Sequence, residues 1–205
     1  MGTVSEQHEN DNALQVLFQK FNKRFQINKL LRSVNAKREK GIPVYTIFNL
    51  LLGLVFTHKN FYTLLQSQKD EAGMGKDAVY RFLSNAKINW KRFIIKLSNS
   101  VISILKESAS DDKNSVFVID DTAYHRDRSN NAELLSCGYD HCEKRYYKGF
   151  TMLTLSWSDG HTLIPVDYRL LAASSDKNIL CPSQMNEDSR TLASRRRIDA
   201  GKDQG

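Results

Sequence analysis

The sequence predicts an α+β protein in which a helical first half is followed by a strand-rich second half. Apolar residues in the first half recur every three or four positions, which is typical of amphipathic helices. The polar stretch SASDDKNS then interrupts this pattern, and beyond it apolar residues alternate or run together as in strands. We therefore expect a disordered segment at 1–12, a helical domain at 13–107, a linker at 108–115, a sheet domain at 116–173 and a polar tail at 174–205.

The excess of positive over negative charge lies entirely in the first half of the chain. The net charge is +7, and residues 1–112 hold 17 Lys and Arg against 10 Asp and Glu, whereas residues 113–205 hold 13 of each. A basic segment beside a neutral one indicates a polyanionic partner, with nucleic acid first. The alternative is a basic surface that is simply solvated.

Targeting and membrane signals are missing from the sequence. The amino terminus, MGTVSEQHENDN, is polar and does not resemble a signal peptide. The longest apolar run, Ile47 to Phe56, is far shorter than the roughly 20 residues that a membrane span needs. Three cysteines form no even disulfide framework. We expect a cytoplasmic protein without a membrane partner.

Helices are predicted in order along the first half. Their apolar positions begin after Ala13, and Asn89 is a plausible N-cap for the last helix. The predicted segments are Ala13 to Phe25, Leu30 to Lys40, Val44 to His58, Phe61 to Gln68, Asp77 to Ser84 and Trp90 to Lys106.

A short helix carries the best candidate for a DNA-reading element. Lys76, Tyr80 and Arg81 follow a glycine turn, as in the recognition element of a helix-turn-helix. They are therefore our candidate DNA-binding residues. The alternative is an ordinary helical hairpin in which Val79 and Phe82 belong to the core.

Three strands are predicted in the second half, at 115–121, 147–157 and 161–171. The SDG sequence between the last two is a hairpin turn signal. Pro165 lacks an N–H donor and favours an edge position for the third strand. Alternation places one set of its residues on a single face: Thr162, Ile164, Val166, Tyr168 and Leu170.

Two adjacent carboxylates, Asp120 and Asp121, directly follow the apolar run VFVI. A carboxylate at the end of a buried strand is costly unless a cation, hydrogen-bond donors or a metal ion meets it. Side chains alternate along a strand, so the two carboxylates point to opposite faces, and periodicity does not choose between them.

A basic helical domain, then VIDDT, then YYKGFTMLTLSWSDGHTLIPVDYRLL, resembles the DDE-type transposases of bacterial insertion sequences. The resemblance spans roughly residues 14–172 and is most specific over 116–171. It implies a ribonuclease-H-like α/β domain, of which this chain has only the first three strands, including the antiparallel hairpin.

The resemblance also implies metal-dependent DNA cleavage and strand transfer at transposon ends. It implies Mg²⁺ or Mn²⁺ as cofactor, double-stranded DNA as partner, and a possible homo-oligomer of the full-length protein. In this group the first catalytic acid directly precedes a threonine, so the resemblance favours Asp121 as metal ligand. Asp120 is then a neighbouring acid of the catalytic site or is paired with a base.

Other polar residues of the second half are weaker candidates. Arg126, Arg128 and Lys148 are candidate phosphate contacts, together with His125, with a solvated turn or an edge cation as the alternative. A zinc site at Cys137, His141 and Cys142 has weak support, because three ligands within six residues have no clear fourth.

The chain departs from the family pattern after the third strand. A second Asp on a fourth strand and a distant Glu are expected there. Glu187 and Asp188 lack a hydrophobic strand before them and are not assigned these roles. We expect an N-terminal portion of a transposase, inactive alone. The alternatives are a non-catalytic DNA-binding protein or regulator, and a helical interaction module without nucleic acid.

Overall fold

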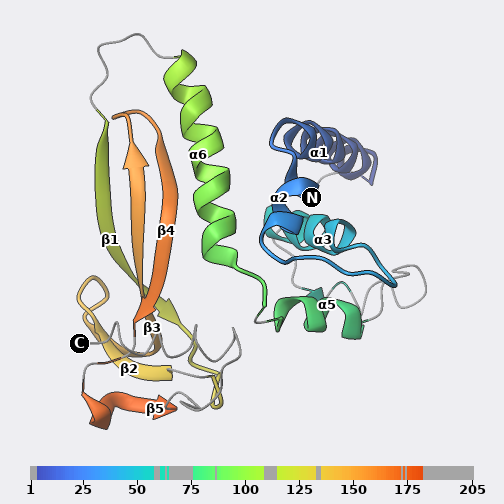
Figure 1. Ribbon diagram of the computed structural model, residues 1–205. Coiled ribbons are helices and arrows are strands. Elements are labelled where there is room, and N and C mark those ends of the chain that lie inside the picture. Colours follow the sequence, from blue (N-terminus) through green and yellow to red (C-terminus); the bar gives the residue numbers. More distant parts are fainter. Residues whose placement is uncertain are drawn as a thin grey trace. The chain divides into compact units, whose positions relative to one another are not determined.

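The computed structural model describes residues 4–57, 61, 62, 64, 76–85, 87–108, 115–132, 135–171, 173 and 175–181 (Figure 1). The chain divides into two compact units, Met1–Phe93 and Ile94–Gly205. Helices make up the first unit and an antiparallel sheet dominates the second, so the fold is α+β as predicted. No helix within the described ranges is long and apolar enough to cross a membrane.

The first unit contains helices α1 (Val4–Arg24), α2 (Ile27–Ser33), α3 (Val44–Phe56) and α5 (Lys76–Leu83). Helix α1 begins at Val4, so the segment 1–12 that we expected to be disordered includes its first turns. Helix α2 ends before the predicted Lys40, and Asn35 just beyond it has a left-handed φ of 64°. Of the short helix predicted from Phe61, three residues are described, and all three are helical.

The core of the first unit combines apolar residues from α2, α3, α5 and the segment 88–93. The ring of Phe48 packs on Phe93 with centroids 5.4 Å apart, and the ring of Phe82 packs on Trp90 at the same distance. The least exposed of these core residues are Ile27, Leu31, Val34, Ile47 and Val79.

Helix α6 (Trp90–Ser108) continues from the first unit into the second. Its predicted N-cap is confirmed, because Asn89 Oδ1 accepts a hydrogen bond from the backbone N–H of Arg92 at 3.0 Å. Further along, Ser98 Oγ donates to the carbonyl of Pro165 in the sheet at 2.5 Å. The second unit therefore begins inside this helix, at Ile94, and not in the linker expected at 108–115.

The sheet contains β1 (Val116–His125), β2 (Leu135–Asp140), β3 (Arg145–Ser158), β4 (Leu163–Leu171) and β5 (Ile179–Cys181). Strand β3 is central, with β1 along one edge (Figure 1). Strands β2 and β4 share its other edge, and β5 pairs with β2. All pairings are antiparallel, and the three predicted strands do lie in one sheet.

The hairpin predicted from SDG is confirmed between β3 and β4. Asp159 Oδ1 accepts hydrogen bonds from the backbone N–H groups of His161 and Thr162, at 3.0 and 2.7 Å, and Gly160 has a φ of 88°. Within the described chain β4 pairs only with β3, so the edge position inferred from Pro165 is also confirmed.

The prediction that the alternating residues along β4, from Thr162 to Leu170, share one face is wrong. Two consecutive residues of β3, Leu155 and Ser156, pair with Asp167 and Pro165, which leaves Val166 as an extra residue in a bulge. The bulge changes the alternation, so Ile164 lies on the face of Trp157 whereas Tyr168 lies on the face of Thr154.

Two strands were missed by the sequence analysis. Strand β2 has few β-branched or aromatic residues and contains Gly138, and β5 is only three residues long. We expected no further strand after residue 171, and β5 contradicts this within the predicted tail.

Strand β1 differs from the prediction in length and in burial. It continues past Asp121 to His125, because β3 is long enough to pair with it as far as Gly149. The apolar run before the carboxylates is not buried, since Phe117 is 68% exposed and Ile119 is 67% exposed. No other element among the described residues covers these side chains.

Candidate functional site

Asp120 and Asp121 lie in the middle of β1 and not at its end. Asp120 pairs with Thr154 and Asp121 with Leu153, so the carboxylates are on opposite faces of the sheet. Both are exposed. Neither forms a hydrogen bond or ion pair with any described residue. The lysine or arginine partner considered for them is therefore not found in this part of the chain.

The described residues do not complete the metal site that the resemblance implies. Hard cations such as Mg²⁺ take six oxygen ligands, several of them from carboxylates or waters. Each face of the sheet presents one of the two carboxylates, and neither belongs to a group of three or more possible metal ligands among the described residues. Glu187 and Asp188 lie outside the described residues.

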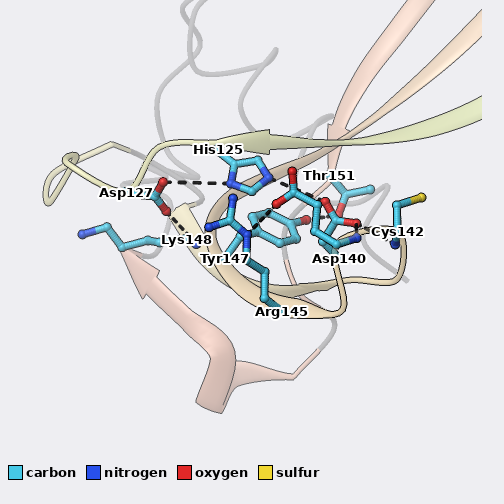
Figure 2. A network of polar contacts seen from close by, with 9 residues as sticks. His125, Asp127, Asp140, Cys142, Arg145, Tyr147, Lys148 and Thr151 are labelled. Atoms are coloured by element: carbon cyan, nitrogen blue, oxygen red, sulfur yellow. Dashed lines mark hydrogen bonds and ion pairs between the residues drawn. The ribbon is translucent and has the colours of Figure 1, made fainter.

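A second polar cluster lies at the end of β1, about 13 Å along the strand from Asp121. There His125 stands between two carboxylates (Figure 2). Its Nε2 is 3.6 Å from Asp140 Oδ2, and its Nδ1 is 3.9 Å from Asp127 Oδ2. Asp140 comes from the end of β2, so the pairing of β2 and β1 with β3 brings these residues together.

Asp140 is fixed by the turn that joins β2 to β3. Its Oδ1 accepts hydrogen bonds from the backbone N–H groups of Cys142 and Glu143, at 2.8 and 3.0 Å. The Glu143 N–H lowers the pKa of the Asp140 carboxyl most, with help from Cys142 and His125 and against the opposing effect of desolvation. Asp140 is therefore a carboxylate at neutral pH. No sequence pattern had pointed to Asp140 or Glu143.

The predicted phosphate contacts gather at this same end of the sheet and not beside Asp121. Arg126 Nη2 donates to the Tyr124 hydroxyl at 2.8 Å, and its guanidinium lies 4.6 Å from the Tyr124 ring centroid. Lys148 Nζ donates to Asn130 Oδ1 at 3.0 Å. Arg128 is exposed in the turn after β1. His125 faces carboxylates, which makes it a poor phosphate contact in this arrangement.

The zinc site considered at Cys137, His141 and Cys142 is not formed. These three residues do not bring their ligand atoms together, although all three are described. The His141 ring instead packs on Tyr139, with centroids 5.1 Å apart.

Helix α5 has a buried and an exposed side. Val79 and Phe82 are buried, as the hairpin alternative required. Lys76, Tyr80 and Arg81 are exposed, as DNA contact requires. Lys76 Nζ lies 5.8 Å from the Tyr80 ring centroid. The three candidate residues are thus accessible together.

The helical unit also has a basic hollow that the sequence analysis missed. It has a volume of about 560 Å³ and is lined by Lys23, Lys29 and Arg32, with Asn22 and Tyr45 among its other residues. Asn22 is 7% exposed and its Nδ2 donates to Asn49 Oδ1 at 2.9 Å, whereas its own Oδ1 has no hydrogen-bond partner among the described residues. The hollow therefore combines three cations with one unused buried acceptor.

Comparison with protein families identifies the family of this chain. The family described as DDE superfamily endonuclease matches residues 30–204, which is most of the chain. No curated protein and no solved structure matches it. The chain therefore belongs to the DDE superfamily of endonucleases, a transposase-like nuclease family, which implies a DNA substrate and the use of divalent metal ions.

Proposed function

We propose that this chain acts on transposon-end DNA as part of a DDE transposase of the insertion-sequence type. The reaction of such an enzyme is metal-dependent DNA cleavage and strand transfer. The observation that carries the proposal is the pair of exposed carboxylates on β1, which have no partner among the described residues. The family uses divalent metal ions, for which such carboxylates are suitable ligands.

In this proposal Asp121 is a ligand for Mg²⁺ or Mn²⁺, and Asp120 is its neighbour on the opposite face. Support for a ribonuclease-H-like domain comes from the order of the predicted strands, because β1, β3 and β4 are adjacent and antiparallel. The remaining metal ligands come from outside the described residues, since one carboxylate on each face does not hold two ions.

The helical unit is the proposed DNA-binding part. Two of its surfaces suit the phosphate backbone. One is the exposed side of α5 with Lys76, Tyr80 and Arg81, and the other is the basic hollow with Lys23 and Lys29. Lysine and arginine bind duplex DNA largely by releasing counterions from its phosphates, so binding should weaken steeply with salt.

We further propose that this chain binds DNA without cutting it. The described residues supply only Asp120 and Asp121 there, one on each face of the sheet, which supports this proposal and also favours the second candidate function, a non-catalytic DNA-binding protein. The two candidates differ at Asp121, because only a transposase portion needs a metal ligand there.

The first experiment tests Asp121 with Mn²⁺, whose unpaired electrons broaden nearby amide resonances. In a full chain that carries His125→Gln, so that Mn²⁺ bound near His125 does not contribute, we expect broadening around residues 120–122 that disappears when Asp121→Asn is added and persists when Asp120→Asn is added. Broadening that is missing from the His125→Gln chain, or that depends on Asp120 alone, contradicts the assigned ligand. Cleavage of duplex DNA by the wild-type chain with Mg²⁺ contradicts the proposed lack of activity.

The second experiment measures binding to a random-sequence DNA duplex across a range of salt concentrations. Each phosphate contact contributes about 0.9 to the slope of log affinity against log salt. We compare two double variants, Lys76→Ala with Arg81→Ala on α5 and Lys23→Ala with Lys29→Ala at the hollow. The double variant on the surface that contacts DNA should lower the slope by about 2. Lys144→Ala, in the exposed turn between β2 and β3, is the control. No binding even at low salt would favour the helical interaction module.

A further inference from the structure

The end of β1 and the turn between β2 and β3 bring three metal-ligating side chains together. His125, Asp140 and Glu143 each offer one ligand atom, and these atoms all lie within 4.8 Å of one another. The set mixes one imidazole nitrogen with two carboxylates. It is separate from Asp121, which lies four residues earlier on the strand.

The spacing of the ligand atoms of His125 and Asp140 fits a shared ion. Zinc binds imidazole nitrogen and carboxylate oxygen at about 2.0–2.2 Å, so two ligands of one tetrahedral ion are about 3.4 Å apart. His125 Nε2 and Asp140 Oδ2 are separated by 3.6 Å. The two N–H groups of the turn hold Asp140 by its Oδ1, which leaves Oδ2 directed at the imidazole (Figure 2).

The opposite side of the imidazole faces a second carboxylate, at a distance longer than a hydrogen bond. A metal-binding histidine usually directs its second ring nitrogen at a carboxylate or carbonyl, which fixes the ring. His125 Nδ1 faces Asp127 Oδ2 at 3.9 Å. The ring also packs on Tyr147, with centroids 5.0 Å apart, and the Tyr147 hydroxyl lies 2.9 Å from Thr151 Oγ1. The His125 imidazole thus lies between the carboxylates of Asp127 and Asp140.

We propose that His125, Asp140 and Glu143 bind a divalent transition metal ion, with Zn²⁺ as the best fit. An imidazole ligand favours zinc over Mg²⁺, which prefers oxygen alone. The ion joins the end of β1 to the β2–β3 turn. It is distinct from the family's catalytic metals, because neither Asp120 nor Asp121 takes part.

Arg145 competes with the ion for the Glu143 carboxylate. Its Nε is 2.5 Å from Glu143 Oε2, so the third ligand is already ion-paired. Removing this cation frees Glu143 and removes a like charge from beside the ion. Arg145→Gln should therefore tighten zinc binding severalfold, which a cluster without a metal function would not show.

The test is calorimetric titration of ZnCl₂ into the chelator-treated full chain. We expect one equivalent to bind, and His125→Gln and Asp140→Asn each to weaken binding at least tenfold. Asp127→Asn should also weaken it, since removal of such supporting carboxylates costs about 10–100-fold. His161→Ala, in the exposed β3–β4 turn, is the matched control and should bind as the wild type does.

Two further variants separate this site from its neighbours. Cys142→Ser should retain binding, because the thiolate is not a ligand in the proposal. The double variant Asp120→Asn with Asp121→Asn should also retain it, so failure of the proposed DNA chemistry would leave this site intact. Zn²⁺ should raise the thermal unfolding midpoint of the wild type and not that of His125→Gln.

Several results would overturn the proposal. They are a wild-type chain that is folded and binds no zinc, binding that survives both His125→Gln and Asp140→Asn, and binding that is lost in Cys142→Ser. Circular dichroism of each metal-free variant separates loss of the site from loss of the fold.

Discussion

Gly149 lies where the backbones of three strands meet. It pairs with His125 on one side and with Ser136 on the other. A Cβ added at Gly149 would lie 2.1 Å from the carbonyl oxygen of Tyr124, which is backbone and has no freedom to rotate away. The glycine of the Lys-Gly-Phe motif is thus required for the close approach of β1.

Gly149→Ala should destabilise the sheet by about 3 kcal/mol, because either neighbouring strand must shift to relieve the clash. Urea unfolding followed by circular dichroism, which reports on both units, measures the change. The control is Gly53→Ala in α3, where the nearest atom, in the Phe18 ring, is 3.7 Å away. There alanine should stabilise the helix by about 0.5–1 kcal/mol. An unchanged unfolding midpoint for Gly149→Ala would contradict this account.

Tyr168 couples the stability of the sheet to alkaline pH. Burial raises the pKa of its phenol above the ordinary value of 10.0, and the Asp167 carboxylate raises it further. A folded-state pKa above the unfolded one means that the native state holds its proton longer. The contribution is therefore complete below about pH 10 and is lost as pH rises through the folded pKa.

Tyr168→Phe should remove this pH dependence. The difference in unfolding free energy between wild type and variant should be constant from pH 8 to about pH 10 and should shrink above it. Tyr146→Phe is the control, since the Tyr146 side chain is 81% exposed. Urea unfolding at a series of pH values gives the curves. A Tyr146→Phe curve that matches Tyr168→Phe would refute the assignment.

At the scale of elements, β1 is an edge strand with apolar side chains exposed on both faces. Within the described chain it pairs only with β3. Edges of this kind promote pairing between molecules. We predict concentration-dependent self-association that Phe117→Thr with Ile119→Thr reduces, and sedimentation velocity measures it.

The double variant should keep its unfolding midpoint, because both side chains are largely exposed already. Leu163→Thr removes an exposed apolar side chain from β4 and should leave the association unchanged. Equal association of wild type and double variant would show that β1 is not the contact.

Elements with strong local patterns were the ones that the sequence predicted. The β3–β4 hairpin followed from SDG and from long β-prone runs, and the start of α6 followed from Asn89. Strand β2 and β5 gave no such pattern, since their pairing depends on register with distant residues. The burial of VFVI was predicted wrongly, because local hydrophobicity does not show whether another element covers it.

At the candidate site, too, local motifs were predictable and contacts between distant residues were not. Adjacent Asp120 and Asp121 were visible in one motif. The cluster of His125, Asp140 and Glu143 combines residues up to 18 positions apart, and only the pairing of β1 and β2 with β3 reveals it. Its members had been read separately, His125 as a phosphate contact and the hairpin as a cysteine site.

At the scale of the whole molecule, the two units differ in how much apolar core they hold. Among the described residues, 11 buried hydrophobic side chains belong to the first unit and four to the second. The four are Leu135, Tyr147, Phe150 and Trp157. Because burial of apolar surface is the main stabilising contribution, the sheet unit should be the less stable one.

The two tryptophans allow each unit to be followed separately. Trp90 packs on Phe82 in the helical unit, and Trp157 is buried in the sheet. In Trp90→Phe the remaining fluorescence comes from Trp157 and follows unfolding of the sheet. In Trp157→Phe it comes from Trp90 and follows unfolding of the helical unit. Each unit is therefore measured in the variant that leaves it unchanged. We expect the Trp157 signal of the first variant to unfold at lower urea than the Trp90 signal of the second. Coincident transitions would mean that the chain unfolds as one cooperative body, and a Trp90 transition at lower urea would place the weaker core in the helices.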